Sequence, residues 1–153
     1  MTQSCSGRLA VNNAKLKKIK AELKAMVIAR GSTLLDIHGV GPAVAARILA
    51  DVGDIARFTD RNRFASWTGT ARLDASSGEQ IRHRLSCAGN RRLNHVLHIA
   101  AIVQLRSDTE GRAYYRRKVA AGNTPLDALR CLKRRLSDVI YRRLVSRRRG
   151  TRR

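Results

Sequence analysis

The sequence predicts a mainly α-helical protein, in which a helix-hairpin-helix and a helical bundle carry a short extended or β-hairpin insertion. Apolar residues recur at helical spacing over most of the 153 residues. Paired glycines followed by Pro42 indicate a tight turn between two short helices. The helical period fails between Thr70 and Gly89. Hydrophobic residues make up 43% of the chain, which suffices for a core in one domain of this length.

The chain is strongly basic, with a formal net charge of +21 at pH 7. Arginine supplies 25 of the 32 basic residues, and its planar fork suits bidentate contacts to phosphate. Most of the excess lies after Gly78, where there are 20 basic residues and 5 acidic ones. Because this charge exceeds what solubility requires, the predicted partner is a polyanion, and nucleic acid rather than a membrane.

The cysteine content and the hydropathy of the chain indicate which cellular environment to expect. Cys5, Cys87 and Cys131 are odd in number and show no paired spacing, so neither a disulfide framework nor a metal site is predicted. No apolar run is long enough to span a bilayer, and the N-terminus lacks the apolar core of a secretory signal. We therefore expect a reduced, cytoplasmic protein with no membrane partner.

Two segments precede the turn. Residues 1–12 are predicted to be disordered, and residues 13–30 to form an amphipathic helix. Apolar side chains recur at helical spacing in that helix, namely Leu16, Ile19, Leu23 and Met26. The helix either packs on its own domain or forms a coiled-coil arm.

The predicted helix-hairpin-helix domain covers residues 31–146 and centres on the turn Gly39, Val40, Gly41. Glycine takes positive φ without a Cβ clash, and Pro42 suits the first position of the second helix. In such a module the turn amides and the helix N-terminus present donors and partial positive charge to a phosphate. Contact to the phosphate backbone predicts poor sequence readout. The alternative is an ordinary helical hairpin whose glycines only end a helix.

The middle of the chain changes character. Thr59 can cap a short helix that runs through Trp67. In the following segment, Ile81, His83 and Leu85 alternate with arginines, which indicates a short strand or an extended loop.

Three helices are predicted after this segment. Asn90 caps a strongly apolar helix that continues to Leu105, and a second helix covers residues 109–121. The third begins at a capping-box-like pair, Thr124 and Asp127. Its inward side is expected to carry Leu129, Leu132, Leu136, Val139, Ile140 and Leu144, and its outer side Arg130, Lys133, Arg134, Arg142 and Arg143. Residues 147–153 form a basic tail that should stay flexible until it meets phosphate.

One stretch could carry chemistry. Ser77 precedes a glycine, which makes its hydroxyl accessible, and nearby arginines could hold a phosphodiester and neutralise developing charge. The candidate contacts in this stretch are Arg82, Arg84, Asn90, Arg91 and Arg92. Without further context, a Ser-Gly pair is more often ordinary turn material.

The order of the motifs resembles the C-terminal domain of one insertion-sequence transposase family, the DEDD-type enzymes guided by a bridge RNA. The resemblance runs from about Asn13 to Leu144. It is carried by residues 37–41, Phe58, residues 64–69, Ser77-Gly78, Gly89-Asn90 with Leu93, and Tyr114 before a basic helix.

The resemblance implies a DNA strand exchange in which Ser77 is the nucleophile. The family's four metal-binding acidic residues lie in another domain, so Mg²⁺ is expected only through a domain that this chain lacks. The implied partners are DNA, a guide RNA and further copies of the complete transposase, in a bacterial nucleoid. Two departures concern substrate contacts: Arg72 replaces a usual proline, and Asn94 replaces a common arginine.

The sequence thus predicts a DNA-binding transposase domain that supplies a serine nucleophile and is inactive alone. Its scattered acidic residues favour a fragment, a decayed copy or a separately encoded half. The alternative is a non-catalytic helix-hairpin-helix protein that binds DNA or structured RNA by shape.

The charge generates the first testable prediction. Binding to duplex DNA should be tight at low salt and should weaken steeply as salt rises, because each neutralised phosphate contributes about 0.9 to the log–log slope. Fluorescence anisotropy across a salt series measures this slope. A slope near zero would contradict the nucleic-acid interpretation.

Overall fold

The structure is a computed structural model that describes residues 3–76, 81–85 and 89–150. It is mainly α-helical, as the sequence predicts. The α-helices are α1 (Gln3–Ala29), α2 (Pro42–Val52), α3 (Arg61–Trp67), α4 (Arg91–Arg106), α5 (Glu110–Ala120) and α6 (Pro125–Gly150). Two 3₁₀ turns, η1 (Leu34–Asp36) and η2 (Ile55–Arg57), and two strands, β1 (Arg72–Ser76) and β2 (Ile81–Leu85), complete the described elements.

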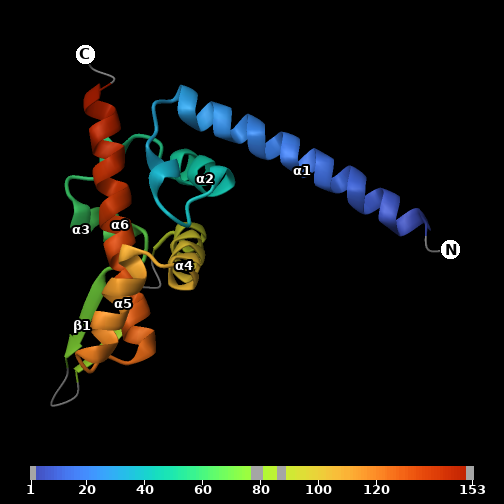
Figure 1. Ribbon diagram of the computed structural model, residues 1–153. Coiled ribbons are helices and arrows are strands. Elements are labelled where there is room, and N and C mark those ends of the chain that lie inside the picture. Colours follow the sequence, from blue (N-terminus) through green and yellow to red (C-terminus); the bar gives the residue numbers. More distant parts are fainter. Residues whose placement is uncertain (1–2, 77–80, 86–88, 151–153) are drawn as a thin grey trace.

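Helix α6 is the axis of the domain (Figure 1). Helices α3, α4 and α5 and the turn η2 all contact it, and α1 contacts α2. The inward stripe of α6 is buried at Leu132, Leu136, Ile140 and Leu144, which lie three or four residues apart. This stripe shares one core with the apolar side of α4 and with the segment around η1 and α2. The predicted core helices are confirmed.

Helix α1 projects away from the rest of the domain and packs on α2 only near its C-terminal end (Figure 1). Val27 is buried there, whereas Leu16 and Ile19 remain about half exposed. The helix begins at Gln3, so the predicted disorder of residues 1–12 is wrong from residue 3 onward. That stretch contains no proline, and residues such as Leu9 and Ala10 favour helix.

The C-terminal end of α6 also corrects an expectation. The helix continues to Gly150, so Arg147–Gly150 are helical and not part of a flexible tail. No proline or glycine lies between Leu144 and Gly150, and arginines are good helix formers that interact favourably with the negative end of the helix dipole. Among the described residues, no helix is both long and apolar enough to cross a membrane.

Most helix starts are where the sequence places them. Asn90 caps α4, and Thr109 caps α5. The cap of α3 is Asp60 and not Thr59, because the Asp60 carboxylate accepts hydrogen bonds from the amides of Asn62 and Arg63 at 2.6 and 2.9 Å. These backbone bonds, that of Arg63 foremost, lower the pKa of Asp60.

The two strands pair antiparallel, with Arg72 opposite Leu85 and Ser76 opposite Ile81. They lie in the segment for which the sequence predicts an extended or β-hairpin insertion. Figure 1 shows the pair leaving the helices near the lower end of α6. The residues that join the strands, including Ser77, lie outside the described residues.

The turn before α2 packs directly on α4. Gly39 has φ +88°, and a Cβ added there would lie 2.7 Å from the carbonyl oxygen of Ala100. The buried side chain of Gln104 donates a hydrogen bond to the His38 carbonyl at 2.9 Å. Glycine is therefore required at position 39 for two reasons, the backbone conformation and the close approach to α4.

Gly39→Ala should accordingly destabilise the fold by about 1–3 kcal/mol, since the new methyl group meets strain and a backbone clash together. Gly31→Ala is the matched control, because Gly31 has φ +62° with open space around its Cβ position. Urea denaturation of both variants measures the difference. Equal losses would show that the contact with α4 does not matter.

Candidate nucleic-acid interface

The hairpin turn connects a single 3₁₀ turn, η1, to helix α2, so its first helix is shorter than the sequence suggests. Ile37 before the turn and Val40 within it are buried, while His38 and Gly41 are exposed. The side chain of Val40 is therefore a core anchor, and its backbone amide already donates to the Ile37 carbonyl at 2.9 Å. Of the three predicted contacts in the turn, Gly41 is the one that is exposed at the surface.

The N-terminus of α2 differs from those of α3, α4, α5 and α6. Side chains cap α3, α4, α5 and α6, whereas no described side chain caps α2. Gly41 occupies the capping position, and no atom lies within 4 Å of where its Cβ would be. An open helix start with unshielded amides is a ready site for an anion.

Arg47 is an exposed residue of α2 that the sequence interpretation passed over. It lies four residues after the exposed Ala43 and therefore on the same side of the helix, one turn from the open start. The i,i+4 spacing from Ala43, in the first turn of the helix, was the available signal.

The second group of predicted contacts lies at the start of α4. Asn90 is the helix cap, because its side chain accepts hydrogen bonds from the amides of Arg92 and Leu93 at 3.0 and 3.1 Å. Those two amides are thus already satisfied, which limits this helix start as a phosphate site. Arg91 and Arg92 are exposed beside it.

Two other predicted contacts lie in β2. The backbone of Arg82 pairs opposite Ala75, and that of Arg84 opposite Leu73. The predicted nucleophile Ser77 falls outside the described residues, one position after the end of β1. Its relation to the arginines therefore stays a prediction.

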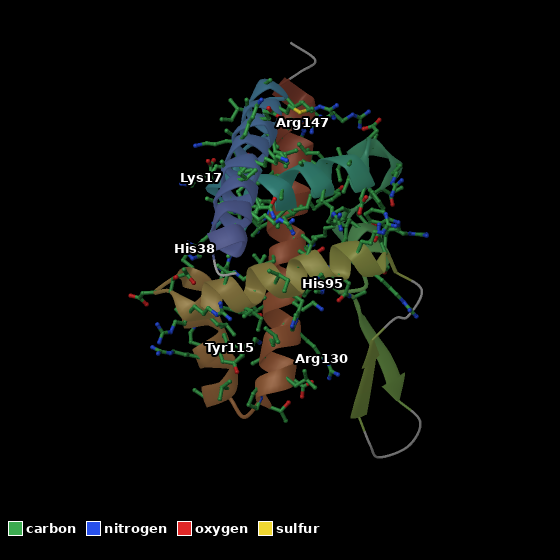
Figure 2. All side chains as sticks on the ribbon, turned by 90° about the vertical axis from the view of Figure 1, so that its right-hand side faces the viewer. Lys17, His38, His95, Tyr115, Arg130 and Arg147 are labelled. Carbon is green, nitrogen blue, oxygen red and sulfur yellow. The ribbon has the colours of Figure 1, made fainter. Side chains whose placement is uncertain are left out.

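The two groups lie apart along α4. Gly39 packs opposite Ala100, ten residues after Asn90, which corresponds to about 15 Å at the rise of an α-helix. Figure 2 shows His38 beside one end of α4, while His95 is nearer the other end, where the strands begin. The predicted contacts therefore form two separate points, not one phosphate pocket.

Ion pairs are distributed unevenly. The five that the described side chains make all involve arginines of α6, namely Arg130, Arg134, Arg135, Arg143 and Arg148. Asp36 and Glu110, which line a cavity of about 270 Å³ beside the turn, are both held in this way. Arg47, Arg91 and Arg92 pair with no described carboxylate.

A partly buried polar network lies at the end of α3, where the chain leads into β1. The Asn94 amide donates to the carbonyls of Thr68 and Gly69 at 3.1 and 2.8 Å, and its oxygen accepts from the Lys133 ammonium at 2.5 Å. Lys133 is only 8% exposed, so its predicted place on the outer side of α6 is wrong. Its aliphatic stem lies along the core while its amine reaches Asn94. Burial, and secondarily the charge of Arg130, lowers the pKa of Lys133.

The aromatic residues beside α3 form a packed cluster. Phe58 contacts Phe64 edge-to-face, with ring centroids 5.2 Å apart, and lies 5.0 Å from Trp67. The Arg57 guanidinium covers the ring of Trp67 at 4.4 Å. Because that ring is covered, the cluster is better suited to anchoring the turn than to stacking on bases.

No metal-binding group was predicted in this chain. Within the described residues, no three histidine, cysteine or acidic side chains gather as a metal site would require. The arrangement therefore does not fit Mg²⁺, and no chemical step is assigned to a metal held by these residues.

Comparison with known proteins places this geometry in a family. Residues 31–116, from before the hairpin turn into α5, match the Transposase IS116/IS110/IS902 family. The chain belongs to this transposase family. The relationship to insertion-sequence transposases that the motifs predict is thereby confirmed at the level of the family. The narrower assignment, to a serine-bearing domain that works with a bridge RNA, stays a prediction.

Individual relatives of the transposase family align with most of this chain. An insertion element IS110 uncharacterized 43.6 kDa protein of Streptomyces coelicolor is 30% identical over 141 residues, covering 90% of this chain and 35% of that protein. A mini-circle putative transposase for IS117 from the same organism is 31% identical over 115 residues, 74% of this chain and 28% of its own length. An insertion element IS900 uncharacterized 42 kDa protein of Mycobacterium paratuberculosis is 32% identical over 111 residues, covering 71% of this chain and 28% of that protein. The chain spans about a third or less of the length of these curated relatives.

Proposed function

We propose that this member of the transposase family binds DNA through the hairpin turn and the N-terminus of α2, and that Ser77 is the nucleophile of strand exchange in a complete transposase. The observation that carries the DNA-binding part is the open start of α2. It is exposed and uncapped, and it is held on α4 by Gly39 and Gln104.

The open helix start suits a phosphate for steric and electrostatic reasons. Gly41 has no side chain to keep a phosphate away, and the first amides of α2 add the positive end of the helix dipole. Arg47 supplies a full charge one turn further on. These groups recognise the DNA backbone and not the bases, so binding should depend little on sequence.

Charge distribution supports the same surface. The acidic side chains nearest the turn, Asp36 and Glu110, are paired with α6 arginines and compete less for an incoming phosphate. Arg91 and Arg92, at the other end of α4, provide the second point of contact. Two points about 15 Å apart on one rigid helix suit a long polyanion better than a small anion.

The proposed chemistry is transfer of a phosphodiester to serine. The Ser77 hydroxyl oxygen forms a bond to phosphorus, its proton passes to a base, and the displaced deoxyribose oxygen leaves with a proton. Arginines such as Arg82 and Arg84 would neutralise charge developing on the phosphoryl oxygens. Mg²⁺, a guide RNA and association with further copies belong to the complete transposase in this proposal. The competing function is shape-dependent binding of DNA or RNA without chemistry.

Gly41→Val tests the hairpin turn. The added side chain should block approach of the phosphate and weaken binding of every DNA sequence about 10-fold, which corresponds to the loss of one hydrogen bond to a charged group. Fluorescence anisotropy with several unrelated duplexes measures the effect. Circular dichroism must show that the variant stays helical.

Gly150→Val is the matched control, because Gly150 is also exposed with open space at its Cβ position. It should bind DNA as the unaltered protein does. If a folded Gly41→Val variant binds normally, the turn is only structural.

Ser77→Ala tests the proposed chemistry. When this chain is joined to the remaining domains of an IS110 relative and supplied with Mg²⁺, guide RNA and DNA, a covalent protein–DNA adduct should form. Ser77→Ala should abolish the adduct, because the hydroxyl itself makes the bond. DNA affinity should barely change, since arginines supply most of the binding.

Peptide mass spectrometry of the adduct locates the bond, and the neighbouring Ser76→Ala is the control. An adduct that persists in Ser77→Ala, or that maps to another side chain, would refute the assignment. Binding without any adduct in the unaltered fusion would favour the non-catalytic function.

A further inference from the structure

The described residues that flank the strand pair in the chain meet at the end of α3. A Cβ on Gly89 would lie only 2.7 Å from the backbone nitrogen of Gly69, so the backbones are in direct contact there. The amide of Asn90 donates to the Trp67 carbonyl at 2.6 Å. Residues 67–69, before β1, and residues 89–90, after β2, are thus fixed to each other, and we call them the root of the strand pair.

Asn94 joins this root to α4. Its amide group donates to two carbonyls, those of Thr68 and Gly69, at the C-terminal end of α3, where helix carbonyls lack intrahelical partners. Its remaining oxygen accepts from Lys133 of α6. One side chain therefore links three helices at the point where the strand pair begins.

Lys133 completes the link from the opposite side. Burying an ammonium group is costly unless it is well placed, and an apolar residue would fill the same position in α6 more cheaply. Its amine lies at the end of α3, where the helix dipole favours positive charge. One turn further along α6, the Ser137 hydroxyl is 3.2 Å from that of Thr68, which adds a second polar link to the same root.

We infer that Asn94 and Lys133 are positioning residues, which fix the direction in which the strand pair leaves the helical core. Only the consequence of this inference rests on the proposed function. Strand β1 ends at Ser76, the residue before the proposed nucleophile. The direction of β1 would therefore determine where the serine meets DNA that is bound at the hairpin turn. The juxtaposition itself is independent of that chemistry.

Residual dipolar couplings test the inference directly on this chain. In the unaltered protein, amides of β1 and β2 should share the alignment tensor of α4 and α6. Asn94→Asp keeps the side-chain oxygen but loses both N–H donors of the amide. In this variant and in Lys133→Met, the magnitude of the alignment tensor fitted to the strands should be smaller than that fitted to the helices. Lys118→Met is the matched control, because it removes a lysine charge from α5, and it should leave both tensors unchanged.

Two outcomes would overturn the inference. Strands that keep the full alignment of the helices in both variants would show that the network does not position them. Loss of the helical fold in both variants would show that the residues are general stabilisers and not positioning residues.

A second measurement separates this inference from the proposed function. In the complete transposase fusion, Lys133→Met should slow adduct formation while leaving DNA affinity unchanged. If the unaltered fusion forms no adduct, the proposed chemistry fails, and the dipolar couplings alone still decide the positioning role. If adduct forms at an equal rate in Lys133→Met and Lys118→Met, the direction of the strand pair does not determine where the serine reacts, and this consequence of the inference is wrong.

Discussion

Burial of the apolar stripe of α6 is the constraint on which the rest of the structure depends. A chain with a net charge of +21 repels itself when it folds, so its compact state needs a continuous apolar contact. Leu132, Leu136, Ile140 and Leu144 supply that contact, and α3, α4, α5 and η2 all pack against the same helix. The position of the hairpin turn follows, because α4, against which the turn packs, is itself placed by α6.

Several of the few acidic residues form ion pairs with arginines of the same helix, α6. The five ion pairs in the described part of the chain join α6 arginines to Asp36, Asp54, Glu110, Asp127 and Asp138. Each exposed pair is weak, but together they reduce the repulsion along a helix rich in arginine. Arg47 of α2 and Arg91 and Arg92 at the start of α4 form no ion pair with a described carboxylate. The arginines that form ion pairs and those proposed to bind phosphate are thereby separated by position.

Local patterns explain what the sequence predicted well. The apolar stripes of α4 and α6, the Asn90 and Thr109 caps and the glycine turn all depend on spacings of a few residues. The errors have a different origin. Lys133 is buried and reaches Asn94 because of packing between distant segments, which spacing along one helix cannot reveal. The cap of α3 is likewise Asp60 and not its neighbour Thr59, a choice that only the folded backbone makes visible.

Helix α4 connects the two halves of the proposed function. The hairpin turn packs near its C-terminal end through Gly39, and the strand pair is attached near its N-terminal end through Asn94. A rigid helix holds these points about 9 Å apart along its axis, so DNA that contacts the turn has a fixed offset from the strands. In such an arrangement, the affinity for DNA depends on the C-terminal end of α4, and the proposed chemistry depends on its N-terminal end. Changes at the turn should then alter how tightly DNA binds, whereas changes at the strand root should alter where the bound DNA can react.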